Sequence, residues 1–476
     1  MSSLSLDPTQ GSLIQQLIYA IQQAIAAREL TPGQRLPSVR QLAATLGIST
    51  FTAADGYSRL VQQGVIVARR GDGYYVARTP LAPPMAPPPV PDARWLTDHR
   101  ITPGPEVVQP GCGWLPSQWY PTQILQRALR QQGREADCGI AYGHSAGWQP
   151  LRQHLWQHHE ALGIPVDPQG VLLTQGASQA LALVVQSELR AGDTVLVDDP
   201  GYCNLITLLQ HAGMRVIGVP WTAQGPDCAV LAEQLHLARP KAFFTNPRQH
   251  NPTGASYSAA TAFRVLQLTA QHHCLIVEDD VSAALTQSAT PTLAALAGLE
   301  HIIYIGSFAK ALAPGLRVGY LLASEERTDR LLRYKVMNAI ASSELAERLV
   351  LRMLKDPDTP KEQQRLRERL LRAGERWQQG LEQIRWQSFC PPQGGLFSWV
   401  RLPEPHQDAL PLSEAALAEG LLLAPGSQFR VDAPATPWLR CNLAYSHQPL
   451  LDFLQRWTRQ QEGSSRSDAL FAPDQK

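Results

Sequence analysis

The segment "IYIGSFAKALAPGLRVGYLLA", residues 303–323, decides how the rest of the chain is interpreted. It consists almost entirely of small and apolar residues, a composition typical of a buried strand, a turn and a second strand. Two cations interrupt it, Lys310 and, seven residues later, Arg317. Taken alone, a lysine directly after a buried strand is most simply a surface residue, so the role of Lys310 has to be judged from the motifs in the rest of the chain.

Similar apolar segments recur through the chain and alternate with helical stretches. They lie at 171–174, 194–199, 215–219, 242–246, 275–280, 303–307 and 318–323. Strands that are apolar throughout and separated by crossover helices predict an α/β fold with a mostly parallel sheet covered on both faces. Ligands of such sheets bind at the carboxyl ends of the strands. Polar residues stand at those ends, namely Thr174, Asp198, Asn246, Asp279 and Ser307.

Composition limits the class of protein. The 476 residues are 44% hydrophobic and 17% charged, which predicts a soluble, globular protein of more than one domain. No apolar run reaches the length of a membrane span, and the N-terminus lacks a signal peptide, so we expect a cytoplasmic protein without membrane contact. Seven scattered cysteines without a C-x-x-C pair predict reduced thiols and no metal site.

A proline-rich segment divides the chain. Residues 80–91, "PLAPPMAPPPVP", contain seven prolines, which exclude a core helix or a central strand. We interpret it as a semi-rigid spacer, the alternative being a proline-rich loop inside one domain. The predicted organisation is a small module at 1–78, a linker at 79–100, a large module at 101–462 with a smaller C-terminal subdomain, and a disordered tail at 463–476.

The small module has the pattern of a winged helix-turn-helix. Apolar residues share one face of a helix over 13–28, Ser38 can cap a helix over 39–46, and Ser49 can cap a third helix that extends to about residue 63. "VIVA" and "YYVA" flank the turn "RRGDG" and predict a hairpin with a basic tip. Residues 1–78 carry seven basic and four acidic side chains. Such a surface suits DNA phosphates, although a merely solvated basic surface is the alternative.

The large module contains the groups that one cofactor requires. A lysine amine in an apolar pocket can attack an aldehyde, and Lys310 is placed to do so. Asp279 can face the protonated nitrogen of a pyridine ring, Tyr202 can stack on the ring, and Asn251 can bind its phenolic oxygen. A phosphate would be bound by Gly176, Ala177, Ser178, Ser307 and Arg317. The ligand that these groups describe is pyridoxal 5′-phosphate.

The small module resembles the GntR family. "LTPGQRLPSVRQLAATLGIST" followed by "VIVARRGDGYYVA" carries the resemblance, which implies DNA contacts from Arg40 and the Arg70–Gly73 wing. The family usually has arginine where this chain has Thr50, so the base preference is open. The full set of residues that we expect at DNA is Arg35, Ser38, Arg40, Ser49, Thr50, Thr52, Arg69, Arg70 and Gly73.

The large module resembles the fold-type-I aspartate aminotransferase superfamily. "SFAKALAPGLRVGY", "NPTG" and "EDD" carry the resemblance, which covers about 101–460. It implies that Tyr142 reaches the phosphate bound by the partner subunit of a dimer, and that Arg440 binds a carboxylate of a substrate or effector; a surface arginine is the alternative. The superfamily usually has a tyrosine where this chain has Ser282.

The two modules together resemble the MocR subfamily of bacterial regulators. The resemblance implies a regulator that depends on pyridoxal 5′-phosphate and binds promoter DNA, by analogy as a head-to-tail homodimer. Our hypothesis for its mechanism is that it senses an amino acid or the vitamer through an aldimine at Lys310. The first alternative is an active aminotransferase with an accessory DNA-binding module. The second is a DNA-binding protein with a vestigial large domain.

Overall fold

The chain forms two compact units, residues 1–92 and 93–476, each of which is described by itself. The computed structural model describes residues 12–26, 30–62, 65–69, 72–77, 107–135, 139–286, 290–432 and 435–470, with side chains as far as residue 461. The predicted linker at 79–100 lies outside the described residues.

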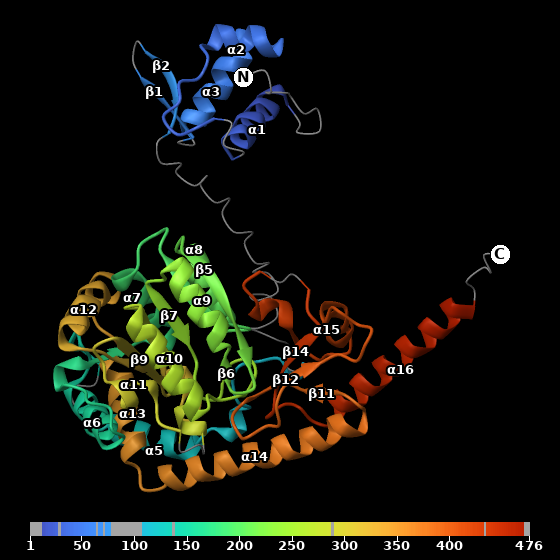
Figure 1. Cartoon of the computed structure of the whole chain (residues 1–476). Coiled ribbons are helices and arrows are strands. Elements are labelled where there is room, and N and C mark those ends of the chain that lie inside the picture. The colour runs from blue at the N-terminus through green and yellow to red at the C-terminus, as the bar shows by residue number, and fades with distance from the viewer. Residues whose placement is uncertain are drawn as a thin grey trace. The chain divides into compact units, whose positions relative to one another are not determined.

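The described residues of the N-terminal unit form three helices and a two-stranded hairpin (Figure 1). They are α1 (Leu13–Ala26), α2 (Val39–Leu46), α3 (Thr50–Gln62), β1 (Ile66–Arg69) and β2 (Gly73–Val76). The winged helix-turn-helix prediction is confirmed. Its small core is made by Leu17, Ile21, Leu42, Tyr57, Leu60 and Ile66, each at most 2% exposed.

Local capping fixes the turn between α2 and α3. Ser38 forms a capping box with Gln41, in which each side chain bonds the backbone of the other. Gly47 ends α2 in the left-handed conformation that glycine adopts at low cost. The Ser49 hydroxyl accepts from the Thr52 N–H at 2.9 Å and begins α3. The two predicted serine caps therefore set the angle at which α3 leaves the turn.

An eight-stranded sheet forms the centre of the large unit, in the order β3-β10-β9-β8-β7-β4-β5-β6. The neighbours from β9 to β5 are parallel, whereas β10 is antiparallel to β3 and β9, and β6 is antiparallel to β5. The prediction of a mostly parallel sheet is confirmed. The strands are β3 (Val171–Thr174), β4 (Thr194–Asp199), β5 (Arg215–Thr222), β6 (Gly225–Pro226), β7 (Ala242–Thr245), β8 (Leu275–Asp279), β9 (Ile302–Ser307) and β10 (Gly319–Leu322).

Helices cover both faces of this sheet (Figure 1). One face packs against α7 (Ala177–Glu188), α8 (Cys203–His211) and α12 (Glu325–Ala339). The other packs against α5 (Thr122–Gln132), α6 (Gln149–Ala161), α9 (Cys228–Ala238), α10 (Ala259–Gln271), α11 (Leu293–Ala297) and α13 (Glu344–Lys355). Successive side chains of a strand alternate between the two cores: Leu172 joins the first, and Val171 and Leu173 join the second. This two-sided burial explains why the strands are apolar throughout.

The C-terminal subdomain has its own antiparallel sheet, in the order β11-β12-β14-β13. Its elements are α14 (Thr359–Gln383), β11 (Gln387–Ser388), β12 (Phe397–Arg401), α15 (Leu410–Ala418), β13 (Ala424–Pro425), β14 (Trp438–Asn442) and α16 (Gln448–Leu470). Helix α16 continues to Leu470, past residue 463 where the sequence predicts a disordered tail, and 471–476 lie outside the described residues. Among the described helices, none has the length and hydropathy needed to cross a membrane.

Candidate functional site

A cavity of about 130 Å³ lies where β4, β7, β8 and β9 end. Eight of the ten residues predicted to hold the cofactor line it, namely Ala177, Ser178, Tyr202, Asn251, Asp279, Ser307, Lys310 and Arg317. The parallel strands bring these distant parts of the chain to one edge of the sheet. The cavity is completed by Asn246, Val281, Ser282, Ala309 and Phe397.

Lys310 follows the end of β9 and is held from outside the central sheet. Its Nζ donates to the carbonyl oxygen of Gly113 at 2.6 Å. Removal from water, assisted by the nearby charge of Arg440, lowers the pKa of the Lys310 amine to about 8, although Asp279 opposes this shift. A lysine with that pKa has a useful neutral fraction near pH 7, and the neutral amine is the form that attacks an aldehyde.

Asp279 is the last residue of β8 and is buried. Its Oδ1 accepts from the Val281 N–H at 3.3 Å, and its backbone carbonyl accepts from the Asn246 side-chain amide at 2.6 Å. Burial raises the pKa of the Asp279 carboxyl to about 7, while the Val281 N–H and Lys310 oppose the shift. A positive pyridinium nitrogen beside this carboxylate would lower that pKa again, because an opposite charge favours the ionised form.

The predicted phosphate-binding residues gather at the start of α7. Gly176 caps this helix with φ of 80°, and a Cβ at that position would lie 2.7 Å from Nη2 of Arg317. Only glycine leaves room for the guanidinium beside the first N–H groups of the helix. Ser307, at the end of β9, accepts from the Ala309 N–H at 3.2 Å. Helix N–H groups, hydroxyls and a guanidinium are the donors that a phosphate requires.

Asn251 and Arg440 are directly connected. Nη1 of Arg440 donates to Oδ1 of Asn251 at 2.9 Å, and Nη2 donates to the Gly111 carbonyl at 2.6 Å. The guanidinium is buried and lies over the rings of Phe397 and Phe429, at 4.7 and 4.6 Å from their centroids. The predicted carboxylate-binding arginine is therefore in contact with the predicted ligand of the phenolic oxygen, rather than on the surface.

Tyr142 is a predicted cofactor residue that lies away from the cavity. It is 86% exposed, in the loop that follows Ile140. Its predicted role requires a partner subunit, so its position in a single chain leaves that role a prediction. Ser282 lines the cavity and precedes the short 3-10 helix η4 (Ala283–Leu285).

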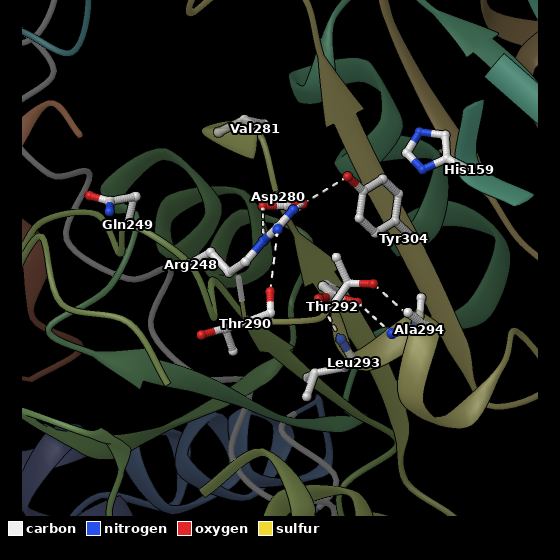
Figure 2. A network of polar contacts seen from close by, with 12 residues as sticks. His159, Arg248, Gln249, Asp280, Val281, Thr290, Thr292, Leu293, Ala294 and Tyr304 are labelled. Atoms are coloured by element: carbon white, nitrogen blue, oxygen red, sulfur yellow. Dashed lines mark hydrogen bonds and ion pairs between the residues drawn. The ribbon is translucent and has the colours of Figure 1, made fainter. Parts of the chain in front are cut away.

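A buried ion pair joins Arg248 to Asp280, the residue that follows Asp279 in the chain (Figure 2). Arg248, in the loop between β7 and Asn251, pairs through Nη2 and Nε with both carboxylate oxygens of Asp280. Tyr304 of β9 donates to Asp280 at 2.8 Å. Asp280 is 1% exposed, so this pair fastens the loop that carries Asn251 to the end of β8 that carries Asp279.

The N-terminal unit presents the predicted DNA-contacting residues on α2, α3 and the hairpin. Arg40, Thr50 and Arg69 are exposed. Arg35 is tied to the hairpin turn, because its Nη2 donates to the Asp72 carbonyl at 2.6 Å. The Arg69 guanidinium lies 4.2 Å from the centroid of the Tyr75 ring.

Other predicted contacts at DNA are constrained in different ways. The hydroxyls of Ser49 and Thr52 bond each other at 2.7 Å. Gly73 begins β2 with φ of 115°, and Arg70 lies outside the described residues. Contact with DNA by each of these residues stays a prediction.

Sequence reasoning missed several residues of these sites. Phe51, in the first turn of α3, is 79% exposed, although aromatic side chains are usually buried. The exposed aromatic next to Thr50 could have been noticed in the sequence. Nothing in the sequence identified Gly113 or Phe397 as residues of the site. Their positions beside the cavity depend on how the 107–116 segment and the C-terminal sheet pack against the central sheet.

Fold and site together define a winged-helix DNA-binding unit joined to an aminotransferase-like unit. Residues 119–456 match the family of class I and II aminotransferases, and residues 13–76 match the gntR family of bacterial regulatory proteins. The chain belongs to the class I and II aminotransferase family and, with its GntR unit, has the MocR-type architecture of transcriptional regulators.

Similar proteins include both regulators and enzymes. The uncharacterized HTH-type transcriptional regulator YdcR of Escherichia coli (strain K12) is 28% identical over 446 residues, which cover 90% of this chain and 95% of the relative. The 2-aminoadipate transaminase of Thermus thermophilus is 31% identical over 360 residues, covering 72% of this chain and 87% of the relative. The crystal structure of LysN, an α-aminoadipate aminotransferase from the same species, has a TM-score of 0.68 at 27% identity and covers 74% of this chain and 92% of that one.

Proteins of the aminotransferase family depend on pyridoxal 5′-phosphate, and the residues of the cavity fit this cofactor. The donor set of amine, carboxylate, amide, hydroxyls and guanidinium corresponds group by group to the aldehyde, ring nitrogen, phenolic oxygen and phosphate. When bound, the cofactor supplies an aldehyde for amines and a ring that withdraws electrons. The chain supplies the binding groups and the charges around them.

Replacing Arg248 with methionine should destabilise the large unit by about 3–5 kcal/mol, because Asp280 would remain buried without its cation. Urea unfolding followed by tryptophan fluorescence would measure this change in the free energy of unfolding. Arg264→Met, at an exposed position of α10, is the matched control and should change it by less than about 0.5 kcal/mol. Equal effects of the two replacements would contradict the importance of the buried pair.

The rate at which the protein binds added pyridoxal 5′-phosphate should rise with pH and have its midpoint near 8, the pKa of Lys310. The sign follows because a lowered pKa makes the neutral, attacking amine available at lower pH. At pH 7 about one lysine in ten would be neutral, against about one in three thousand at an ordinary pKa. Stopped-flow absorbance would measure the rates, and a midpoint near 10.5 would contradict the assignment.

Proposed function

We propose that this protein is a transcription regulator whose affinity for promoter DNA changes when an amine-bearing effector reacts at the cofactor held by Lys310. The main support is the presence, in one chain, of a winged helix and a cavity that contains a lysine amine with a pKa of about 8. An amino acid or the vitamer is the expected effector class. The protein acts where promoter DNA is accessible, in the cytoplasm.

Arg440 offers a way to sense the carboxylate of an amino acid. Its guanidinium already donates to Oδ1 of Asn251 and to a backbone carbonyl. A carboxylate that binds Arg440 bidentately would compete with Asn251 and the Gly111 carbonyl for the guanidinium, because Nη1 and Nη2 both already donate to these groups. Asn251 would then present its amide differently to the phenolic oxygen of the cofactor. This competition would couple recognition of the carboxylate to the electronics of the cofactor that Lys310 holds.

Within this proposal each cavity residue has a defined task. Asp279 keeps the ring nitrogen protonated, Tyr202 covers the ring, and the cluster of Ser178, Ser307 and Arg317 anchors the phosphate. Tyr142 reaches the phosphate bound by a partner subunit in a head-to-tail homodimer. The predicted domain limits at 78/79 and 100/101 belong to the same proposal, whereas α16 crosses the predicted limit at 462/463.

An aminotransferase with an accessory DNA-binding module is the competing function. Lys310 and Asp279 would serve both activities, so the cavity alone does not discriminate between them. Ser282 stands where the superfamily resemblance predicts a tyrosine, which leaves Asn251 as the proposed ligand of the phenolic oxygen and favours retention of the cofactor over repeated turnover.

Binding of promoter DNA, followed by fluorescence anisotropy, should change at least about fivefold when the effective amine is added to the cofactor-loaded protein. Lys310→Ala should abolish this response and retain basal DNA binding, whereas Lys361→Met, on the exposed side of α14, should retain the response. If no amine that reacts with the bound aldehyde alters DNA affinity, the sensing proposal is wrong. Multiple turnovers of amino-group transfer to a keto acid would then favour the enzyme.

Replacing Phe51 with alanine should weaken specific DNA binding by roughly tenfold, because an exposed aromatic ring at the start of a recognition helix can pack on a thymine methyl group. The operator sequence would first be selected from a random DNA pool. Substituting uracil for its thymines, which removes the methyl groups, should weaken the wild type and leave Phe51→Ala unaffected. Leu13→Ala, at an exposed position of α1, is the control, and equal sensitivity of wild type and Phe51→Ala to uracil would contradict the contact.

A further inference from the structure

The loop from Ala141 to Trp148 is held by hydrogen bonds through its second half, from Ser145 to Trp148. The Ser145 carbonyl accepts from Nζ of Lys335 at 2.5 Å, and the Trp148 N–H donates to Oε2 of Glu347 at 2.7 Å. The Ala146 carbonyl accepts from the N–H of Leu173 in β3 at 3.0 Å. Two helices and a strand therefore hold the backbone of one short loop.

The two side chains that hold this loop are a buried cation and a buried carboxylate. Lys335 of α12 is 0% exposed and Glu347 of α13 is 1% exposed. Burial lowers the pKa of Lys335 and raises that of Glu347, and each charge counteracts the shift of the other. Arg152 of α6 is the further charge that acts on both. Neither Lys335 nor Glu347 lines the cofactor cavity. Direct contact with the cofactor therefore does not explain why these two charges are buried, although burying a charge costs free energy.

Glycine packing fixes the shape of the same loop. A Cβ on Gly143 would lie 3.0 Å from Cβ of Glu344, at the start of α13. Gly147 has φ of 103°, and a Cβ there would lie 2.4 Å from Leu173. The loop thus approaches α13 and β3 more closely than residues with side chains would permit.

This closely held loop carries an exposed aromatic residue. Tyr142 is 86% exposed and stands directly before Gly143. A hollow on the surface is lined by Tyr142, Met337 and Ile340, among other residues. Met337 and Ile340 are exposed, and so is Ile140, which stands two residues before Tyr142 in the sequence. A loop fastened by two buried charges, with its aromatic side chain directed to solvent, is suited to present that side chain in a fixed position.

We propose that Lys335 and Glu347 are positioning residues, which hold the 141–148 loop so that Tyr142 is presented to the cofactor phosphate of a second copy of this chain. The inference rests on the proposed function for the role of Tyr142, but the fastening of the loop is a property of the single chain. Lys335 acts through the Ser145 carbonyl and Glu347 through the Trp148 N–H. The opposite charges of Lys335 and Glu347 each favour the charged form of the other, which reduces the cost of burying them.

A double-mutant cycle on cofactor affinity tests this proposal. Dissociation constants for pyridoxal 5′-phosphate, measured from the visible absorbance of the full chain, should rise about tenfold in Tyr142→Phe and by a similar factor in Lys335→Met. The double variant should be no weaker than either single variant, because Lys335 acts through Tyr142. Losses that multiply in the double variant, or a Tyr142→Phe variant with unchanged affinity, would overturn the proposal.

The conservative variant of the carboxylate provides a second readout. Glu347→Gln retains a side-chain oxygen for the Trp148 N–H and should stay within about twofold of the wild type, whereas Glu347→Leu should resemble Lys335→Met. Lys361→Met removes an exposed lysine of α14 and should change nothing. If Glu347→Gln and Glu347→Leu lost cofactor affinity equally, packing of the side chain would explain the loss. The role assigned to the hydrogen bond between Glu347 and the Trp148 N–H would then be overturned.

Hydrogen exchange separates failure of this inference from failure of the proposed function. Amides of residues 141–148 should exchange at least about tenfold faster in Lys335→Met than in the wild type, with or without cofactor. If the wild type does not bind pyridoxal 5′-phosphate, the proposed function is wrong, and the exchange rates still decide whether Lys335 holds the loop. Unchanged exchange of 141–148 in Lys335→Met would overturn the inference on its own.

Discussion

The electrostatic interaction between Lys310 and Asp279 inside one desolvated cavity is the constraint on which the rest of the site depends. Burial disfavours both charges, lowering the pKa of the amine to about 8 and raising that of the carboxyl to about 7. Each group partly restores the charge of the other. The cavity therefore holds an amine whose neutral form, the one that attacks an aldehyde, is accessible near neutral pH, and a carboxyl that a neighbouring positive charge keeps ionised.

Such a pair is useful only if the strands that carry it are fixed. Asp279 ends β8 and Lys310 follows β9, which are parallel neighbours in the sheet. The Arg248–Asp280 pair and the Asn246 amide fasten the adjacent loop to the end of β8. The Arg248–Asp280 pair is a strong connection, because removing either partner would leave the other charge buried without compensation.

The strands could be predicted from the sequence because their signals are local, and the runs "VLLT" and "TVLVDD" coincide with β3 and β4. The partner of Lys310 could not, because the Gly113 carbonyl comes from a segment far away in sequence. A motif identifies side chains that touch a ligand, since the chemistry restricts their type. It does not identify Lys335 or Glu347, which hold backbone groups and whose burial becomes visible only when α12 and α13 pack against the 141–148 loop.

Effector binding at the cavity can change DNA binding by the N-terminal unit only if one thermodynamic condition is met, whatever the arrangement of the two units. The N-terminal unit has a core of its own, so it does not need the cofactor to fold. If an effector at the cavity changes DNA affinity by some factor, DNA must change effector affinity by the same factor. The effector must therefore bind two states of the chain differently, and the shared guanidinium of Arg440 is a group whose contacts can differ between them. A ligand that bound both states equally would occupy the cavity without regulating the promoter.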